Sequence, residues 1–159
     1  MGASPFATPA TVRRVDAKEL NATDAPAVAA VFAASRAASM PWLPVLHSPE
    51  EDREYFAEQL ESRTGIGVEH EGALVGFAIA HPGWLDHLYV APDCRGLGLG
   101  TTLITTVRQR VPGELSLWVF ARNTAALGFY DRLGALEEER TDGAGNEEHE
   151  PDVRLLLPA

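Results

Sequence analysis

The sequence has almost no cysteine, no long apolar run and a shortage of basic side chains. Cys94 is the single cysteine, which excludes an internal disulfide framework and a cysteine-rich zinc site. No apolar stretch approaches the roughly 18 residues that a membrane-spanning helix needs. Lysine and arginine total 13 against 23 acidic residues, a formal net charge of −10. This charge opposes nucleic-acid binding, whose affinity comes mainly from neutralising phosphates.

The remaining composition is typical of one globular domain. The 159 residues are 45% hydrophobic, which is enough for a single core. Residues 1–10 are small, polar and interrupted by proline, with neither the basic nor the apolar region of a signal peptide. We therefore expect a disordered tail over 1–10, one domain over 11–159 and a cytoplasmic protein. The acidic charge is compatible with a cationic small-molecule partner, because a negative field concentrates amines.

Hydrophobic periodicity and turn signals predict a mixed α/β chain. Helices are expected over 24–39, 48–63 and 98–111, with a short one between 123 and 134. Strands are expected over 11–16, 66–70, 74–81, 84–90, 115–120, 136–141 and 152–157. The strand, helix and strand between 84 and 120 form one βαβ unit, so its two strands should be parallel.

The most informative segment runs from Leu85 to Thr101 and reads LDHLYVAPDCRGLGLGT. A strand, a proline turn and three closely spaced glycines lead into an amphipathic helix. The first N–H groups of a helix have no internal partner and lie at the positive end of its dipole, so such a start binds anions. The glycines let the backbone approach a ligand with no Cβ between them. The expected ligand carries a pyrophosphate.

Two common nucleotide motifs do not fit this segment. A dinucleotide fold needs the spacing GxGxxG, and a P-loop needs a lysine after its last glycine. The pattern Arg95-x-x-Gly98-x-Gly100 instead resembles the coenzyme A loop of the GNAT superfamily of N-acetyltransferases. The segment from Leu117 to Ala135, LWVFARNTAALGFYDRLGA, resembles the same family's N-x-x-A-x-x-F-Y-x-x-L-G motif. The resemblance covers roughly positions 11–157.

The resemblance implies a GNAT-type α/β fold, a mixed central sheet of about six to seven strands flanked by about four helices. It also implies acetyl-CoA as co-substrate, with pantetheine lying between two splayed parallel strands. Strand main chain would pair with pantetheine, and loop N–H groups would hold the pyrophosphate. The residues implied in this binding are Leu88, Tyr89, Val90, Arg95, Gly96, Leu97, Gly98, Leu99, Gly100, Thr101, Asn123 and Tyr130.

Tyr130 is the candidate catalytic acid, because the family's matching tyrosine protonates the departing thiolate. Its ordinary pKa near 10 keeps the hydroxyl protonated at neutral pH. The alternative is a packed aromatic, since Leu127, Tyr130 and Leu133 share one helical face. The family often carries glutamates on its splayed strands, where this chain has Trp84 and Trp118.

The general base is therefore open. Asp86 and His87 are neighbours on one strand, so alternation predicts that at most one faces the site. His87 has the better pKa for the task and is the candidate base. His47 is a second candidate. A structural role for either histidine, and a water chain that ends on backbone carbonyls, are the alternatives.

Two loops are expected to recognise the acceptor. The apolar loop 40–46 is either a plug on the core or one wall of a pocket. The acidic loop 142–151 either binds a cationic acceptor or is a solvated surface. The candidate acceptor-binding residues are Trp42, His47, Glu147 and Asp152. No metal is expected, because the histidines and acids lack tight ligand spacing.

The predicted function is direct acetyl transfer from acetyl-CoA to a primary amine, with a small amine or an amino-acid derivative as acceptor. A protein N-terminus or lysine is the alternative acceptor, and a coenzyme A sensor without turnover is the alternative class. We expect neither nucleic-acid nor membrane partners. A homodimer is compatible with the family. Cys94 is interpreted as an incidental loop thiol near the cofactor.

Overall fold

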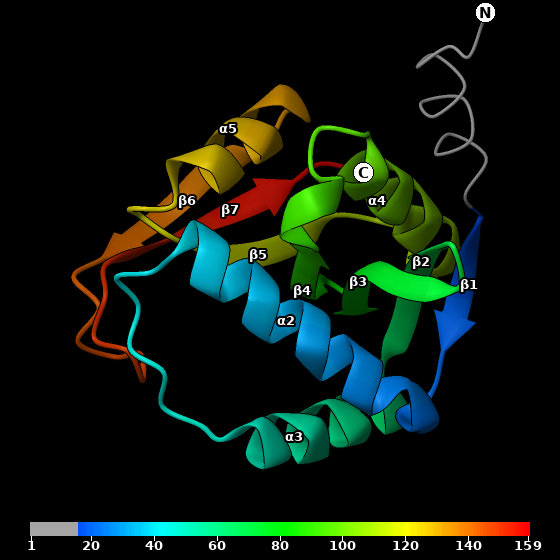
Figure 1. The fold of residues 1–159 in the computed structure, drawn as a ribbon. Coiled ribbons are helices and arrows are strands. Elements are labelled where there is room, and N and C mark those ends of the chain that lie inside the picture. Colours follow the sequence, from blue (N-terminus) through cyan, green and yellow to red (C-terminus); the bar gives the residue numbers. More distant parts are fainter. Residues whose placement is uncertain (1–15) are drawn as a thin grey trace, which may run out of the picture.

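The computed structural model describes residues 16–159 (Figure 1). One seven-stranded sheet has the order β1-β2-β3-β4-β5-β7-β6. Its strands are β1 (Ala17–Leu20), β2 (Thr64–His70), β3 (Ala73–His81), β4 (Trp84–Val90), β5 (Leu115–Phe120), β6 (Leu136–Thr141) and β7 (Asp152–Leu157). The α-helices of the described part are α2 (Ala25–Ser39), α3 (Pro49–Ser62), α4 (Leu99–Arg110) and α5 (Thr124–Arg132). Two short 3-10 turns are η1 (Ala22–Asp24) and η2 (Pro92–Cys94).

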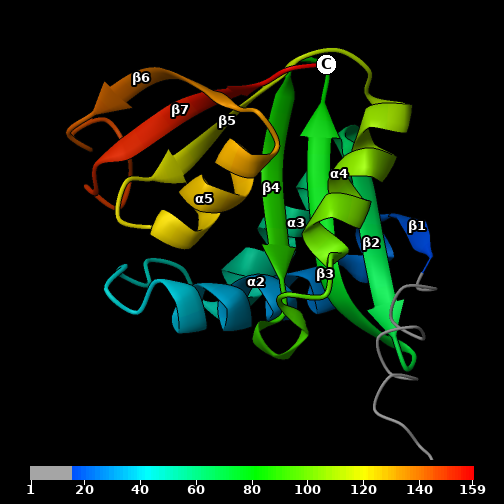
Figure 2. The ribbon, with the colours of Figure 1, turned by 90° about the horizontal axis from the view of Figure 1, so that it is seen from above.

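Helices cover both faces of the sheet, α2 and α3 on one side and α4 and α5 on the other (Figures 1 and 2). Alternation along β3 serves both layers, because successive side chains of a strand point to opposite faces. Phe77 and Ile79 pack with α2 and α3, whereas Ala78 and Ala80 pack with α4. The mixed α/β fold class predicted from the sequence is confirmed.

Local sequence signals set the helix ends. Ser48 accepts a hydrogen bond from the Glu51 N–H, and the Glu51 carboxylate accepts one from the Ser48 N–H, so the predicted capping box begins α3. Asn123 caps α5 by accepting from the Ala126 N–H, and Gly134 follows that helix at φ +85°. These are the ends that the sequence predicts.

The predicted strand over 11–16 lies almost entirely outside the described residues. Residues 11–15 lie outside the described part of the chain, as does the tail over 1–10, and Asp16 is not in a strand. The first described strand is β1, in which Leu20 is buried and pairs with Gly65 of β2. A Cβ on Gly67 would lie 2.8 Å from the Leu20 side chain. The absence of a side chain at Gly67 therefore leaves space for Leu20. The sequence of β1 alone does not reveal this space, because it depends on a residue of the neighbouring strand.

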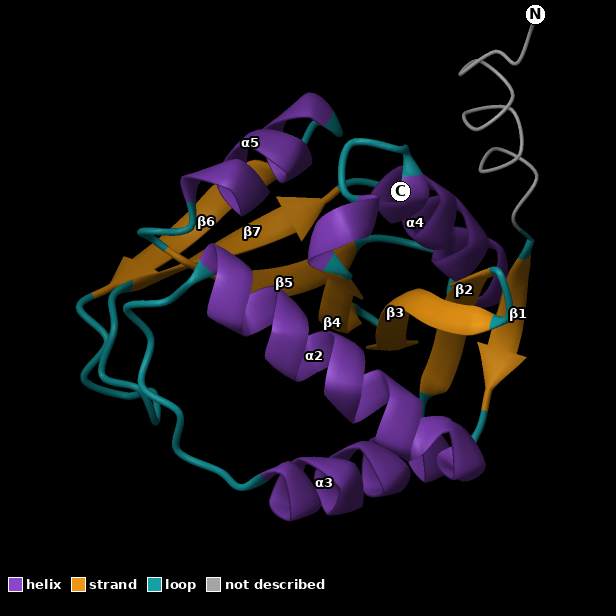
Figure 3. Cartoon of the chain, viewed as in Figure 1, coloured by secondary structure: helices purple, strands orange, loops and turns teal. Residues whose placement is uncertain are grey.

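Two loops approach each other beyond the ends of the helical layer, the α2–α3 loop (40–48) and the β6–β7 loop (142–151) (Figure 3). They come from opposite ends of the chain, and the ion pair between His47 and Glu147 joins them. In the described residues, no helix combines the length and apolarity that crossing a membrane demands.

Candidate active site

The centre of the sheet opens between β4 and β5. These parallel strands pair at one position, Trp84 with Ser116, where the Ser116 N–H donates to the Gly83 carbonyl at 2.8 Å. Beyond it the strands diverge (Figure 2), as β4 continues along β3 and β5 along β7. One edge of β4, including Leu88 and Val90, therefore has no strand partner on the β5 side. The predicted parallel βαβ unit is confirmed.

The glycine loop follows β4 and ends at the start of α4. Gly96 and Gly98 have φ values of +76° and +80°, and a Cβ added to either would find no atom within 4 Å. Gly98 caps α4 without a side-chain hydrogen bond. The first helical bond joins the Thr102 N–H to the Gly98 carbonyl. The preceding N–H groups, including that of Thr101, are therefore free to bind an anion.

Gly100 has a different role from the other two glycines. A Cβ at this position would lie 3.0 Å and 3.1 Å from ring atoms of Phe129 on α5. Leu99 is buried in the core, while Leu97 is 39% exposed. Gly100 thus lets α4 and α5 pack closely, whereas Gly96 and Gly98 keep a surface open.

The Arg95 side chain points away from the glycine loop. Its Nη2 donates to the carbonyl and the hydroxyl of Ser35, at 3.2 Å and 3.1 Å. Ser35 is a buried polar residue of α2. Arg95 therefore ties the loop to α2, a positioning contact that fixes where the free N–H groups lie.

Tyr130 lies on the α4–α5 side of the opening. It is buried, with its ring 5.1 Å from that of Phe129. Burial, with a smaller contribution from Tyr89, raises the pKa of Tyr130 well above its ordinary value. The hydroxyl is consequently protonated at any physiological pH, as a proton donor must be.

Asn123 connects α5 with the α2–α3 loop. Its Oδ1 is occupied by the capping bond to Ala126 at 3.2 Å. Its Nδ2 points at the Met40 sulfur at 3.6 Å. The Asn123 Nδ2 can therefore donate a second hydrogen bond to a ligand.

Asp86 and His87 point to the same face, which corrects the alternation argument. The β3–β4 register shifts between Ile79 and Ala80, so β4 has a bulge at Asp86. Asp86 contacts His81 at 2.7 Å and Arg63, the residue after α3, at 3.4 Å. The His87 Nε2 lies 2.8 Å from the Tyr55 hydroxyl of α3. Both side chains therefore lie on the α2–α3 side of the sheet.

His87 is held neutral by its surroundings. The rings of Phe32, Phe56 and Tyr89 lie 5.2–6.4 Å from its own. Desolvation, with smaller contributions from Arg36 and Arg63, lowers the pKa of His87 to about 4. A neutral imidazole can accept a proton, but this low pKa makes it a weak base.

A cavity of about 300 Å³ lies beside α2, and we call it the α2 cavity. Its lining residues are Phe32, Ala33, Arg36, Ala37, Met40, Pro41, Leu43, Pro44, Val45, Leu46, His47, Asp52 and Glu148. Met40 and Leu43 are buried while Val45 is 91% exposed. Both interpretations of the apolar loop therefore hold, since its first residues pack on the core and the loop also forms the cavity wall.

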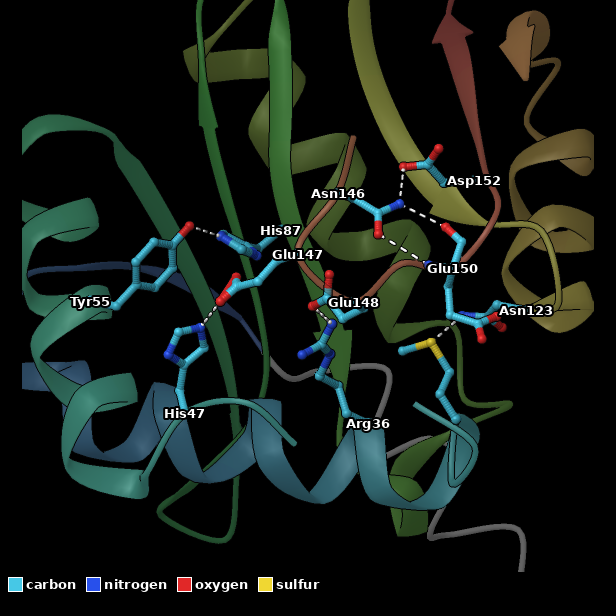
Figure 4. A network of polar contacts seen from close by, with 11 residues as sticks. Arg36, His47, Tyr55, His87, Asn123, Asn146, Glu147, Glu148, Glu150 and Asp152 are labelled. Carbon is cyan, nitrogen blue, oxygen red and sulfur yellow. Dashed lines mark hydrogen bonds and ion pairs between the residues drawn. The ribbon is translucent and has the colours of Figure 1, made fainter. Parts of the chain in front are cut away.

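Two ion pairs join the β6–β7 loop to this cavity (Figure 4). The Arg36 Nη2 donates to the Glu148 Oε2 at 3.1 Å, and both side chains are largely buried. Arg36 also lies over the ring of Phe120, 5.9 Å from its centroid. His47 pairs with Glu147 nearer the surface. Arg36 and Glu148 therefore sit beside the carboxyl end of β5.

The remaining predicted acceptor residues lie around Phe120. The Arg122 guanidinium lies 4.2 Å from the Trp42 ring, whose centroid is 6.3 Å from that of Phe120. Asp152 holds the β6–β7 loop through the Asn146 Nδ2, at 3.1 Å, and through Thr141. Figure 4 shows that Asp152 lies apart from His47 and Glu147. Its contacts shape the loop.

A second cavity, of about 560 Å³, borders the last residues of β5. It is lined by Trp118, Val119, Phe120, Glu139, Thr141, Gly145, Asn146 and Asp152. Within residues 16–159, no three His, Cys, Asp or Glu side chains come close enough to hold a metal ion.

Comparison with known proteins identifies the family of the chain. A sequence profile described as the Acetyltransferase (GNAT) family matches residues 32–135, more than half of the chain. The chain belongs to the GNAT family. It is accordingly an acetyltransferase.

Several relatives carry related names. The peptidyl-lysine N-acetyltransferase YjaB of Salmonella typhimurium is 30% identical over 98 residues, 62% of this chain and 67% of that protein. The solution structure of apo YjaB from Escherichia coli superposes with a TM-score of 0.73 at 22% identity, covering 90% and 97% of the two chains. The PaiA N-acetyltransferase of Thermoplasma acidophilum, solved with coenzyme A, superposes with a TM-score of 0.72 at 19% identity. The match covers 91% of this chain and 99% of that protein. These two structures support the fold alone.

The relatives are matched over limited lengths. An uncharacterized N-acetyltransferase of Methanocaldococcus jannaschii is 33% identical over 90 residues, which is 40% of its own length. The match to Escherichia coli YjaB covers 50% of that protein.

Sequence reasoning missed four residues that shape the site. They are Ser35, Arg36, Tyr55 and Glu148. Glu148 lies within the acidic loop that the sequence singles out, but nothing in the loop distinguishes it from its neighbour Glu147. The partners of Ser35, Arg36 and Tyr55 are 32 or more residues away, so no local pattern reveals them.

Proposed function

We propose that this protein transfers an acetyl group from acetyl-CoA to a primary amine. The divergence of β4 from β5 beside a helix start with free N–H groups carries the proposal. Gly96 and Gly98 fit a bound pyrophosphate, because their positive φ angles and empty surroundings leave room for an anion. PaiA, a protein of the same fold, was solved with coenzyme A, and we propose the same ligand for this chain.

The main chain of this protein would provide most of the binding. The open edge of β4 from Leu88 to Val90 would pair with pantetheine as an added strand does. The N–H groups from Gly96 to Thr101 would bind the pyrophosphate, and the Asn123 Nδ2 would donate to the pantetheine arm. Arg95 contributes by fixing the loop on α2.

Acetyl-CoA supplies a thioester, whose carbonyl carbon the amine attacks directly. The new C–N bond forms and the C–S bond breaks. Tyr130 donates a proton to the departing thiolate, and the amine loses one. Coenzyme A with a free thiol and an acetamide are the products. The raised pKa keeps the Tyr130 hydroxyl protonated at neutral pH, so that it can donate a hydrogen bond, and then its proton, to the developing thiolate.

His87 is the proposed recipient of the amine proton, with Tyr55 as its hydrogen-bond partner. At neutral pH protonation of His87 costs about 4 kcal/mol, given its pKa of about 4. The proton must therefore pass on to solvent, and the 43% exposed Tyr55 lies on that route.

Two glycine variants test the cofactor site. Gly98→Glu places a carboxylate where the pyrophosphate would lie. Gly113→Glu is the matched control, because Gly113 also has a positive φ, +100°, and open space around it, but lies beyond the other end of α4. Both variants suffer the same backbone strain.

The binding affinity of each variant is measured by calorimetric titration with acetyl-CoA and, separately, with NAD as the alternative cofactor. Micromolar acetyl-CoA affinity that Gly98→Glu abolishes and Gly113→Glu keeps supports the proposal. Equal loss in both variants, or binding of NAD in place of acetyl-CoA, overturns it. Amine transfer is then followed by mass spectrometry of the acetamide, because the Cys94 thiol would add to a thiol-release signal.

The acceptor is either a small amine or a protein lysine. A relative named peptidyl-lysine N-acetyltransferase favours the second class. The α2 cavity, which two loops joined by His47 and Glu147 cover, favours the first. We propose the small amine, and the relative rates with free amines and lysine-containing peptides separate the two.

A further inference from the structure

The α2 cavity contains one carboxylate whose charge is not balanced by a neighbour. Of the charged groups in its wall, Arg36 pairs with Glu148, and His47 pairs with Glu147 at the rim. Asp52 forms no ion pair with any residue of the described chain. It is half-buried, and desolvation raises the pKa of its carboxyl despite the opposing influence of His47 and Arg36.

The helix dipole does not by itself explain this aspartate. Acidic residues at the start of a helix are favourable, and Glu50, Glu51 and Asp52 all lie in the first turn of α3. Glu50 and Glu51 are exposed, whereas the Asp52 side chain lines the cavity. A half-buried carboxylate that faces an otherwise largely apolar cavity is costly unless a ligand supplies the opposite charge.

Two residues of the cavity wall contact the splayed strands. Phe32 in its wall packs edge-on against Tyr89 of β4, with ring centroids 5.1 Å apart. Arg36 in the same wall lies over Phe120 of β5. The wall that contacts both strands therefore also includes Asp52 of α3. Figure 4 shows the paired Arg36 and Glu148 side chains, with His47 nearer to α3.

We propose that the α2 cavity binds an acceptor that carries a second cationic group, and that Asp52 pairs with this group while the reacting amine lies near Tyr89. The proposal rests on the proposed acetyl transfer and names its substrate class, diamines. The apolar wall suits the methylene chain between the two nitrogens. With a volume of about 300 Å³, the cavity is at the small end of ligand sites.

Two amines of equal chain length isolate the second charge, cadaverine and pentylamine. The wild-type enzyme should acetylate cadaverine with a kcat/KM about tenfold higher, the effect of one partly desolvated ion pair. Asp52→Asn should lower kcat/KM for cadaverine by about the same factor and leave that for pentylamine within about twofold. Glu50→Gln is the matched control, since it removes one exposed charge from the same helical turn, and it should change neither rate.

The outcomes separate this inference from the proposed function. The diamine assignment is overturned if the wild type acetylates the two amines at equal rates. It is also overturned if Asp52→Asn lowers kcat/KM equally for cadaverine and pentylamine. In both cases acetyl transfer itself stands. Preferred acetylation of a lysine-containing peptide, unaffected by Asp52→Asn, also overturns it. Acetyl-CoA binding with no transfer to any amine overturns the proposed function, and the diamine assignment falls with it. Melting temperatures of both variants exclude misfolding as the cause.

Discussion

Protonation of His87 should destabilise the fold, because this histidine is neutral among aromatic rings in the native state. Its pKa is about 4 in the folded protein, against 6.5 for an ordinary histidine. Between these values the unfolded chain binds a proton that the folded chain does not. Stability is therefore fully present above pH 6.5 and falls as the pH decreases toward 4. At 1.36 kcal/mol per pH unit, the whole loss is about 3 kcal/mol.

The variant His87→Gln isolates this contribution, because glutamine keeps a hydrogen-bonding group beside Tyr55 and does not titrate. Urea unfolding at pH 7.5 and pH 5 gives the two free energies. The wild type should lose about 2 kcal/mol more than the variant between these conditions, since the other titrating groups are common to both. An equal loss in the wild type and His87→Gln would refute the reasoning.

Three further substitutions test packing and charge around the site. Gly100→Ala should destabilise the protein by about 1–3 kcal/mol, seen as a lower melting temperature, because its Cβ would press on the Phe129 ring; an unchanged melting temperature would contradict the close helix packing. Phe56→Ala should cost about 3–5 kcal/mol in urea unfolding, since the fully buried ring contacts three aromatic neighbours and His87; a loss below about 1 kcal/mol would be inconsistent with that packing. Glu148→Gln should cost about 1–3 kcal/mol because it leaves the Arg36 guanidinium half-buried without its carboxylate, and stability equal to the wild type would show that the pair is not formed.

The sequence predicts the strands around the site closely, for identifiable reasons. The strand β4 begins and ends at the predicted residues, and so does β5. Each follows a Pro-Gly turn, Pro82-Gly83 or Pro112-Gly113, that separates it from the preceding element. Ser48 and Asn123 mark helix starts through bonds that span three residues, and a bond of that length is visible in the local sequence.

Features that depend on two distant segments could not be predicted in this way. The bulge at Asp86 arises from the pairing of β4 with β3 and places Asp86 and His87 on one face, where alternation predicts opposite faces. Arg36 and Glu148 meet across 112 residues, and no periodicity connects them. The free N–H groups of the glycine loop follow from its own sequence, but the contact of Arg95 with Ser35, which fixes that loop, requires the folded chain.

The role of Tyr130 as proton donor tests the central claim most directly. Tyr130→Phe removes the hydroxyl and keeps the ring packed in the core, so kcat for amine acetylation should fall by roughly 10²–10⁴. The affinity for acetyl-CoA, measured by calorimetry on the same preparation, should stay within about twofold of the wild type, because main-chain groups provide most of the binding. An unchanged kcat with unchanged affinity would contradict the assignment of Tyr130 as the acid.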